Sequence, residues 1–98
     1  MSEDIWNRSD VLSYAEHKNA NPLYVVYFAY WCHHCVGMIK KLGDNFNQDN
    51  NNIVFIPDTY IGSDLDVPHF PYLHVVKNGK ISVGNIDDIY NVIPNTQF

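Results

Sequence analysis

Positive charge is scarce in this sequence. Six of the 98 residues are Lys or Arg and eleven are Asp or Glu, which gives a formal net charge of −5. So few cations cannot form a continuous basic surface for phosphate contacts, and we therefore expect no nucleic acid partner. Long hydrophobic runs are missing as well. The apolar run at residues 24–31 is far shorter than the roughly 20 residues of a membrane-spanning helix, so we expect no membrane span.

A secretory signal is also missing from the first residues. They lack the basic start and the apolar stretch of such a signal, which predicts a cytoplasmic, reducing location. The length predicts a single domain over residues 1–98, because it is sufficient for one core and too short for two. Hydrophobic residues make up 46% of the chain and charged residues 17%, so a disordered acidic tail is excluded.

The sequence has two cysteines, and both lie in the stretch Cys32-His33-His34-Cys35. A bridge between them would close a loop too small to stabilise the fold much, since stabilisation by chain entropy grows with loop length. In a chain of cytoplasmic character this spacing indicates either redox chemistry or half of a metal site.

The apolar pattern predicts four strands. Residues 53–56 and 72–76 are predicted as strands, and residues 23–29 are rich in β-branched and aromatic side chains and show no alternation with polar residues. That pattern is typical of strands buried on both faces by helices. Asn78-Gly79 is a two-residue hairpin signal, after which residues 80–83 return as a fourth strand.

Three helices are predicted around these strands. The first spans about residues 9–18 with Ser9 as its N-cap, the second follows Trp31, and the third spans residues 86–93. Residues 58–69 are expected to be mostly irregular. Because the first strand-helix-strand unit needs parallel strands, the predicted fold is α/β, with about four strands in a mixed sheet flanked by helices.

The strand-to-helix junction gives the two cysteines different environments. Cys32 is predicted at the N-terminal tip of the second helix, where the helix dipole and unpaired N–H groups stabilise a thiolate. His33 and His34 can add positive charge or hydrogen bonds to the same sulfur. Cys35, one turn further and on the apolar stripe, is predicted to be buried. We therefore expect Cys32 to be the nucleophile and Cys35 the resolving thiol.

Two other interpretations of the pair remain open, namely a metal half-site and an inert core pair. Residues 32–35 cannot easily all reach one zinc ion from adjacent helix positions, and no second C-x-x-C or H-x-x-H motif is present. His69 and His74 could assist, although His74 is expected to be a surface or packing residue. Zinc would need a second chain, so we expect no metal in this chain and no bound cofactor.

The wider context of the motif resembles a known family. Trp31 and the cysteine pair follow a predicted buried strand and open a helix, and Phe70-Pro71 leads into a later strand that ends in Lys77-Asn-Gly. Residues 28–35 are similar to the active-site segment of the thioredoxin superfamily. Residues 71–79 are similar to its cis-proline strand and hairpin. The resemblance covers about residues 9–93.

This resemblance implies a trimmed thioredoxin-like fold and a thiol-disulfide oxidoreductase. The implied partners are protein disulfides or dithiols and an unidentified reductase or oxidase. Pro71 would be the cis-proline, Phe70 would pair its backbone with an incoming peptide, and Trp31 would shape the docking surface beside Cys32. The alternatives are a non-catalytic binding or scaffold module with the same fold, and a zinc-linked dimer.

Two departures from thioredoxin itself affect the expected chemistry. Val26 stands where thioredoxin carries a buried acid that accepts the proton of the buried thiol, so His34 or water would take the proton of Cys35. The histidine before the second cysteine resembles disulfide isomerases and the bacterial periplasmic oxidant. Their potentials are roughly −180 and −120 mV, against about −270 mV for thioredoxin. The His-His pair therefore predicts a more oxidising protein than thioredoxin.

Overall fold

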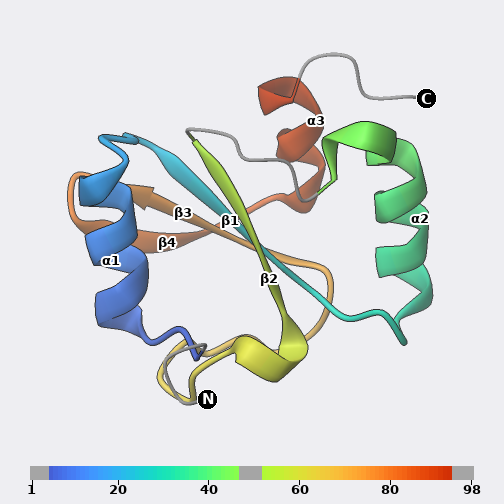
Figure 1. The fold of residues 1–98 in the computed structure, drawn as a ribbon, viewed down its shortest axis with the longest axis horizontal. Coiled ribbons are helices and arrows are strands. Elements are labelled where there is room, and N and C mark those ends of the chain that lie inside the picture. Colours follow the sequence, from blue (N-terminus) through green and yellow to red (C-terminus); the bar gives the residue numbers. More distant parts are fainter. Residues whose placement is uncertain (1–4, 47–51, 94–98) are drawn as a thin grey trace.

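A four-stranded mixed sheet lies between helices on its two faces (Figure 1). The computed structural model describes residues 5–46 and 52–93. Its helices and strands are, in chain order, α1 (Arg8–His17), β1 (Leu23–Phe28), α2 (His33–Leu42), β2 (Ile53–Pro57), β3 (Tyr72–Lys77), β4 (Lys80–Gly84) and α3 (Ile89–Val92). Short 3-10 helices are η2 (Gly43–Asn45), η3 (Asp58–Tyr60) and η4 (Ile86–Asp88).

The strand order across the sheet is β2-β1-β3-β4. Strands β1 and β2 are parallel, with Val25 opposite Val54, whereas β1 and β3 are antiparallel, with Val25 opposite His74. Strands β3 and β4 form an antiparallel hairpin. The predicted α/β class and mixed four-stranded sheet are therefore confirmed, and the arrangement is compatible with a trimmed thioredoxin-like fold.

The sheet has an apolar core on each face. Val25 and Tyr27 of β1 pack in the core under α1, while Val26 and Phe28 pack in the core under α2 and α3. Figure 1 shows α1 on one side of the sheet and the other two helices on the opposite side. Burial on both faces explains why β1 is apolar at successive positions instead of alternating with polar residues.

The start of α1 corrects one sequence expectation. Its N-cap is Asn7 and not Ser9, which lies in the first turn of the helix. Asn7 is extended, and its backbone N–H donates a 2.8 Å hydrogen bond to the Asp10 carboxylate. Asparagine and serine cap equally well. The carboxylate three positions after Asn7 decides between them, because it satisfies the N–H of the cap residue.

Two further predictions concern the second half of the chain. Asn78 and Gly79 both have positive φ, 53° and 75°, so the predicted two-residue hairpin turn is confirmed. The predicted closing helix begins as the 3-10 helix η4, in which the Asn85 side chain accepts a hydrogen bond from the Asp87 N–H, and only its second half is α-helical. The polar residues 45–52 are also expected to form a loop after the second helix, and residues 47–51 of this stretch lie outside the described residues.

The lengths of the helices bear on the expected absence of a membrane span. Both α1 and α2 have ten residues. Within residues 5–46 and 52–93, no helix combines the length and the apolar character needed to cross a membrane.

Candidate functional site

Cys32 occupies the junction between β1 and α2. Its backbone N–H donates to the Ala29 carbonyl at 3.2 Å, and its own carbonyl accepts the N–H of Val36 at 3.0 Å. Cys32 is thus the N-cap residue of α2 and has an extended backbone. The free N–H groups of the first helical turn therefore lie around its side chain, where they stabilise negative charge.

The sulfur of Cys32 is partly exposed and acidic for a thiol. Burial raises its pKa, but hydrogen bonds from the Cys35 backbone N–H, the Cys35 thiol and the His34 backbone N–H outweigh burial, so the net pKa lies below the ordinary value. The Sγ atom also lies 3.3 Å from the carbonyl oxygen of Phe70 and donates to it as a thiol. The groups that donate to this sulfur favour the thiolate, which is the nucleophilic form, whereas the bond to the Phe70 carbonyl is made only by the protonated thiol.

Cys35 has the opposite character. Its side chain is 0% exposed and packs in the core with Val26. The Ala29 N–H donates to its sulfur at 3.4 Å, but burial dominates and raises the pKa of the thiol to about 11. Both cysteines are free thiols. The predicted position of Cys32 at the helix tip and the predicted burial of Cys35 are therefore confirmed, and their roles as nucleophile and resolving thiol stay predictions.

The predicted docking residues lie beside Cys32. The Phe70–Pro71 peptide bond is cis, as the resemblance implied, and so is the bond between Asn21 and Pro22. The ring of Trp31 meets the ring of Phe70 edge to face at a centroid distance of 5.7 Å. Trp31 is 71% exposed, so a large aromatic surface is accessible to solvent at the residue directly before Cys32.

Asp58 belongs to the site, although the sequence analysis did not single it out. The indole Nε1–H of Trp31 donates a 2.8 Å hydrogen bond to its carboxylate. Its charge also acts on Cys35, whose pKa is raised first by burial and in smaller part by Asp58. The sequence held a signal for this contact. Asp58 follows β2 directly, and the carboxyl ends of the parallel strands β1 and β2 meet at one edge of the sheet.

The histidines occupy two different places. His33 and His34 are exposed on α2. Among the hydrogen bonds of the described residues, none joins either imidazole to the Cys32 sulfur, so their effect on the thiolate stays a prediction. His34 and His69 line a hollow of about 330 Å³ together with Phe70 and Pro71, and neither cysteine lines it.

His74 lies on the other face of the sheet. It is buried in the core under α1, and its Nδ1 atom is 2.9 Å from the Tyr27 hydroxyl. Burial lowers the pKa of His74, which keeps the imidazole neutral. Of the two roles expected for His74, at the surface or in packing, the structure shows packing, on the face of the sheet opposite to the cysteines.

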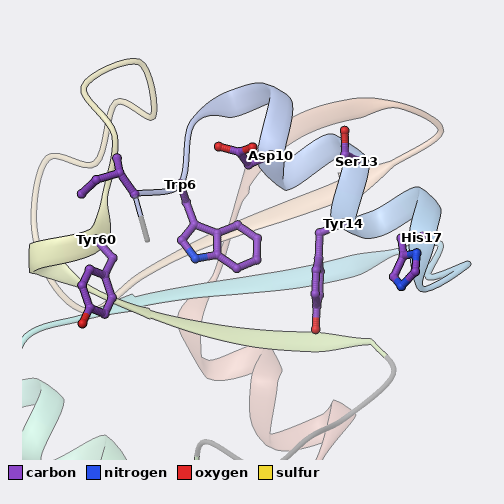
Figure 2. Close-up of a pocket in the computed structure, with 7 residues that line it drawn as sticks. Trp6, Asp10, Ser13, Tyr14, His17 and Tyr60 are labelled. Atoms are coloured by element: carbon purple, nitrogen blue, oxygen red, sulfur yellow. The ribbon is translucent and has the colours of Figure 1, made fainter. Parts of the chain in front are cut away.

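A second hollow lies beside α1, on the far side of the molecule from α2. It has a volume of about 520 Å³ and is lined by Ile5, Trp6, Asp10, Ser13, Tyr14, His17 and Tyr60. Figure 2 shows the rings of Trp6 and Tyr14 beneath α1, and their centroids are 5.2 Å apart. None of the residues that line this hollow is a cysteine, so thiol chemistry belongs to the junction at Cys32.

Within residues 5–46 and 52–93, no group of three or more His, Cys, Asp or Glu side chains is placed to hold a metal ion. Comparison with protein-family models finds no family that matches this sequence, and comparison with curated proteins finds no relative. The geometry around Cys32 and Cys35 therefore carries the functional argument.

Proposed function

We propose that this protein is a thiol-disulfide oxidoreductase of the thioredoxin superfamily, which acts on protein disulfides or dithiols through Cys32 and Cys35. One observation carries the proposal. The pKa of the partly exposed Cys32 is lowered, whereas that of the buried Cys35 is raised to about 11. An inert core pair would need no such difference, while a nucleophile and a resolving thiol require it.

The proposed reaction begins with the Cys32 thiolate. It attacks one sulfur of a substrate disulfide, forms a Cys32-substrate mixed disulfide and releases the other substrate sulfur as a thiolate that takes up a proton. Cys35 then loses its proton and attacks the Cys32 sulfur, which releases the second substrate thiol and leaves a Cys32-Cys35 disulfide. Two electrons pass to the substrate, and a separate reductase must return them. The reverse sequence oxidises a dithiol, with an oxidase as the final acceptor.

The second step depends on removing the proton from Cys35. Val26 packs in the same core cluster as Cys35 and offers no carboxylate. The exposed imidazole of His34, the residue directly before Cys35, or a water molecule at the surface, is expected to take this proton. Resolution by Cys35 is therefore expected to be slow at neutral pH, because a pKa of about 11 leaves little thiolate.

The direction of electron flow depends on the reduction potential. Groups that stabilise the reduced form, with its Cys32 thiolate, make a dithiol more oxidising. The backbone N–H groups of His34 and Cys35 act on that thiolate already. If the imidazoles of His33 and His34 add to this effect, the potential lies nearer to roughly −200 mV than to the value of about −270 mV for thioredoxin.

The proposal is tested with Cys32→Ser and Cys35→Ser and with the unmodified chain. Alkylation of each remaining thiol is followed against pH, and the pair is equilibrated with glutathione buffers of set ratio. We expect Cys32 to react faster than free cysteine at pH 7, Cys35 to react slowly below pH 9, and the pair to form a reversible disulfide. The change of His33 and His34 to Gly-Pro should shift the potential toward that of thioredoxin.

Other results would contradict the proposal. If Cys32 reacts no faster than free cysteine and no reversible disulfide forms, a non-catalytic binding module is the better description. Metal in the purified protein, lost together with a dimer on chelation, would instead favour the zinc-linked dimer.

A further inference from the structure

The proposed redox site lies at one end of the sheet, where three loops meet. Residues 29–32 follow β1, residues 58–71 run from β2 to β3, and residues 85–88 follow β4. The strand directions bring all three loops to the same end of the sheet, because β1 and β2 are parallel and β3 is antiparallel to both β1 and β4. We call this end of the sheet the cysteine end.

Charge is unevenly divided between the two ends of the sheet. The loops of the cysteine end contain five carboxylates and no Lys or Arg, the carboxylates being Asp58, Asp64, Asp66, Asp87 and Asp88. The Asp64 carboxylate accepts a hydrogen bond from the backbone N–H of Arg8 at 3.1 Å. Lys77 and Lys80 flank the hairpin at the opposite end of β3 and β4.

Two hollows flank Phe70, and carboxylates line both. One has a volume of about 390 Å³ and includes Asp58 and Asp66. The other, of about 330 Å³, includes Asp87. The Phe70 carbonyl is 3.3 Å from the Cys32 sulfur. A substrate segment that lies across Phe70, with its own sulfur at Cys32, would therefore have one hollow on each side of that sulfur.

Aromatic surface adds to this negative charge. Trp31 is 71% exposed and Tyr30 is 65% exposed. Exposed indole and phenol faces attract the side chains of Lys and Arg, whose methylene stems also pack on apolar rings. The second hollow is lined by Tyr90 as well as Asp87, but the Tyr90 ring already contacts the ammonium group of Lys41 at 4.2 Å, so Asp87 is the group in this hollow that a partner's cation would meet.

From this complementarity we infer that the partner of the cysteine pair is a protein segment in which Lys or Arg residues flank the reacting cysteine. The inference rests on the proposed function and names the class of its substrate. The cationic heads lie against Asp58 and Asp66 on one side of Phe70 and against Asp87 on the other. Small anionic thiols such as glutathione, with two carboxylates and one ammonium group, are disfavoured by the same charges.

Electrostatics of this kind acts mainly on the rate of encounter. Complementary charge raises association rates by roughly 10- to 1,000-fold, and added salt removes the gain. At an ionic strength of about 0.1 M the screening length is about 10 Å, so the exposed carboxylates still act on a bound or nearby segment.

The test uses the reduced full chain and three matched peptide disulfides. Each peptide carries one cysteine in disulfide linkage to the same neutral thiol, flanked by Lys, by Gln or by Glu. The second-order rate constant of disulfide cleavage is measured at pH 8 and divided by the rate constant with dithiothreitol. This division removes the intrinsic reactivity of each peptide. We expect the Lys peptide to exceed the Glu peptide by about 10-fold or more at low salt, and the ratio to approach one in about 0.5 M salt.

Variants that remove carboxylate charges show which residues cause the preference for the Lys peptide. Asp66→Asn combined with Asp87→Asn is expected to reduce the Lys-to-Glu ratio by several-fold. Glu16→Gln combined with Asp44→Asn removes the same amount of charge elsewhere and should leave the ratio unchanged. Equal normalised rates for the Lys and Glu peptides, with a fast Gln peptide, would overturn this inference and leave the proposed function standing. A Gln peptide cleaved no faster than by free cysteine would overturn both.

Discussion

The indole of Trp31 and the carboxylate of Asp58 are joined by a 2.8 Å hydrogen bond across 27 positions of sequence. The bond fixes the residue before Cys32 against the segment that follows β2. It also brings a negative charge close enough to Cys35 to contribute to the raised pKa of that thiol, after burial as the main cause.

The change Asp58→Asn is predicted to lower the pKa of Cys35. Asparagine retains an oxygen that can accept the Trp31 N–H, so the variant removes charge and keeps the hydrogen bond. The measurement is the pH profile of Cys35 alkylation in a Cys32→Ser background. Asp64→Asn in the same loop is the control and should leave the profile in place. A profile that does not move in Asp58→Asn would show that the carboxylate does not act on the buried thiol.

Val26→Asp is predicted to speed the release of substrate from the mixed disulfide. A carboxylate beside Cys35 can accept its proton, and a positioned base contributes roughly 10²- to 10⁴-fold, so we expect an increase of at least about 10-fold at pH 7. The buried polar group should also lower the free energy of unfolding by about 1–3 kcal/mol or more. Val26→Asn carries a similar cost in stability without the base. Equal release rates for the two variants would contradict the proton-acceptor argument.

Stability is predicted to fall in acid because of His74. Burial lowers the pKa of this imidazole in the folded protein, while the charge of Arg8 lowers it further and that of Asp66 opposes the shift. Below the ordinary histidine pKa of about 6.5 the unfolded chain therefore binds a proton that the folded chain does not, and the free energy of unfolding decreases as pH falls. Urea unfolding at pH 7.5 and pH 5.5 measures this loss. His74→Gln should show a smaller loss, and an equal loss would exclude His74 as its source.

Gly84→Ala and Gly37→Ala are predicted to change stability in opposite directions. A Cβ atom at Gly84 would lie 2.8 Å from a methyl group of Val75 and 2.9 Å from one of Leu73, whereas at Gly37 in α2 nothing lies within 4 Å. We expect Gly84→Ala to cost about 1–3 kcal/mol through overpacking. Gly37→Ala should add about 0.5–1 kcal/mol through helix propensity. Thermal unfolding of both variants measures the difference, and destabilisation by Gly37→Ala would contradict the prediction.

Much of the fold was predictable because local patterns determine it. The uninterrupted apolar run of β1 signals burial on both faces, and Asn78-Gly79 supplies the two positive φ angles of the hairpin turn. The apolar stripe of the second helix predicted that Cys35 lies in the core and that Cys32 lies at the N-terminal tip of the helix. In these places local preference and tertiary packing favour the same conformation.

Features that join distant parts of the chain were not predictable from local pattern. The Tyr27 hydroxyl that satisfies His74 comes from a strand 47 residues earlier, so burial of this histidine depends on the register of β1 and β3. The contact of Asp58 with Trp31 likewise depends on the parallel pairing of β1 and β2. The capping choice at Asn7 was missed for a smaller reason, because two equally good cap residues stand two positions apart.

The two tryptophans of the sequence occupy opposite environments, with consequences for optical work on the protein. Trp6 is half-buried and packs against Tyr14, whereas Trp31 is exposed and directly precedes Cys32. Thiolates and disulfides quench nearby indole emission, so the fluorescence of Trp31 should follow the oxidation state of the pair while Trp6 gives a constant background. Trp31 can thus report the oxidation state of the cysteine pair. A Trp6→Phe variant would let stopped-flow fluorescence follow each exchange step without an added dye.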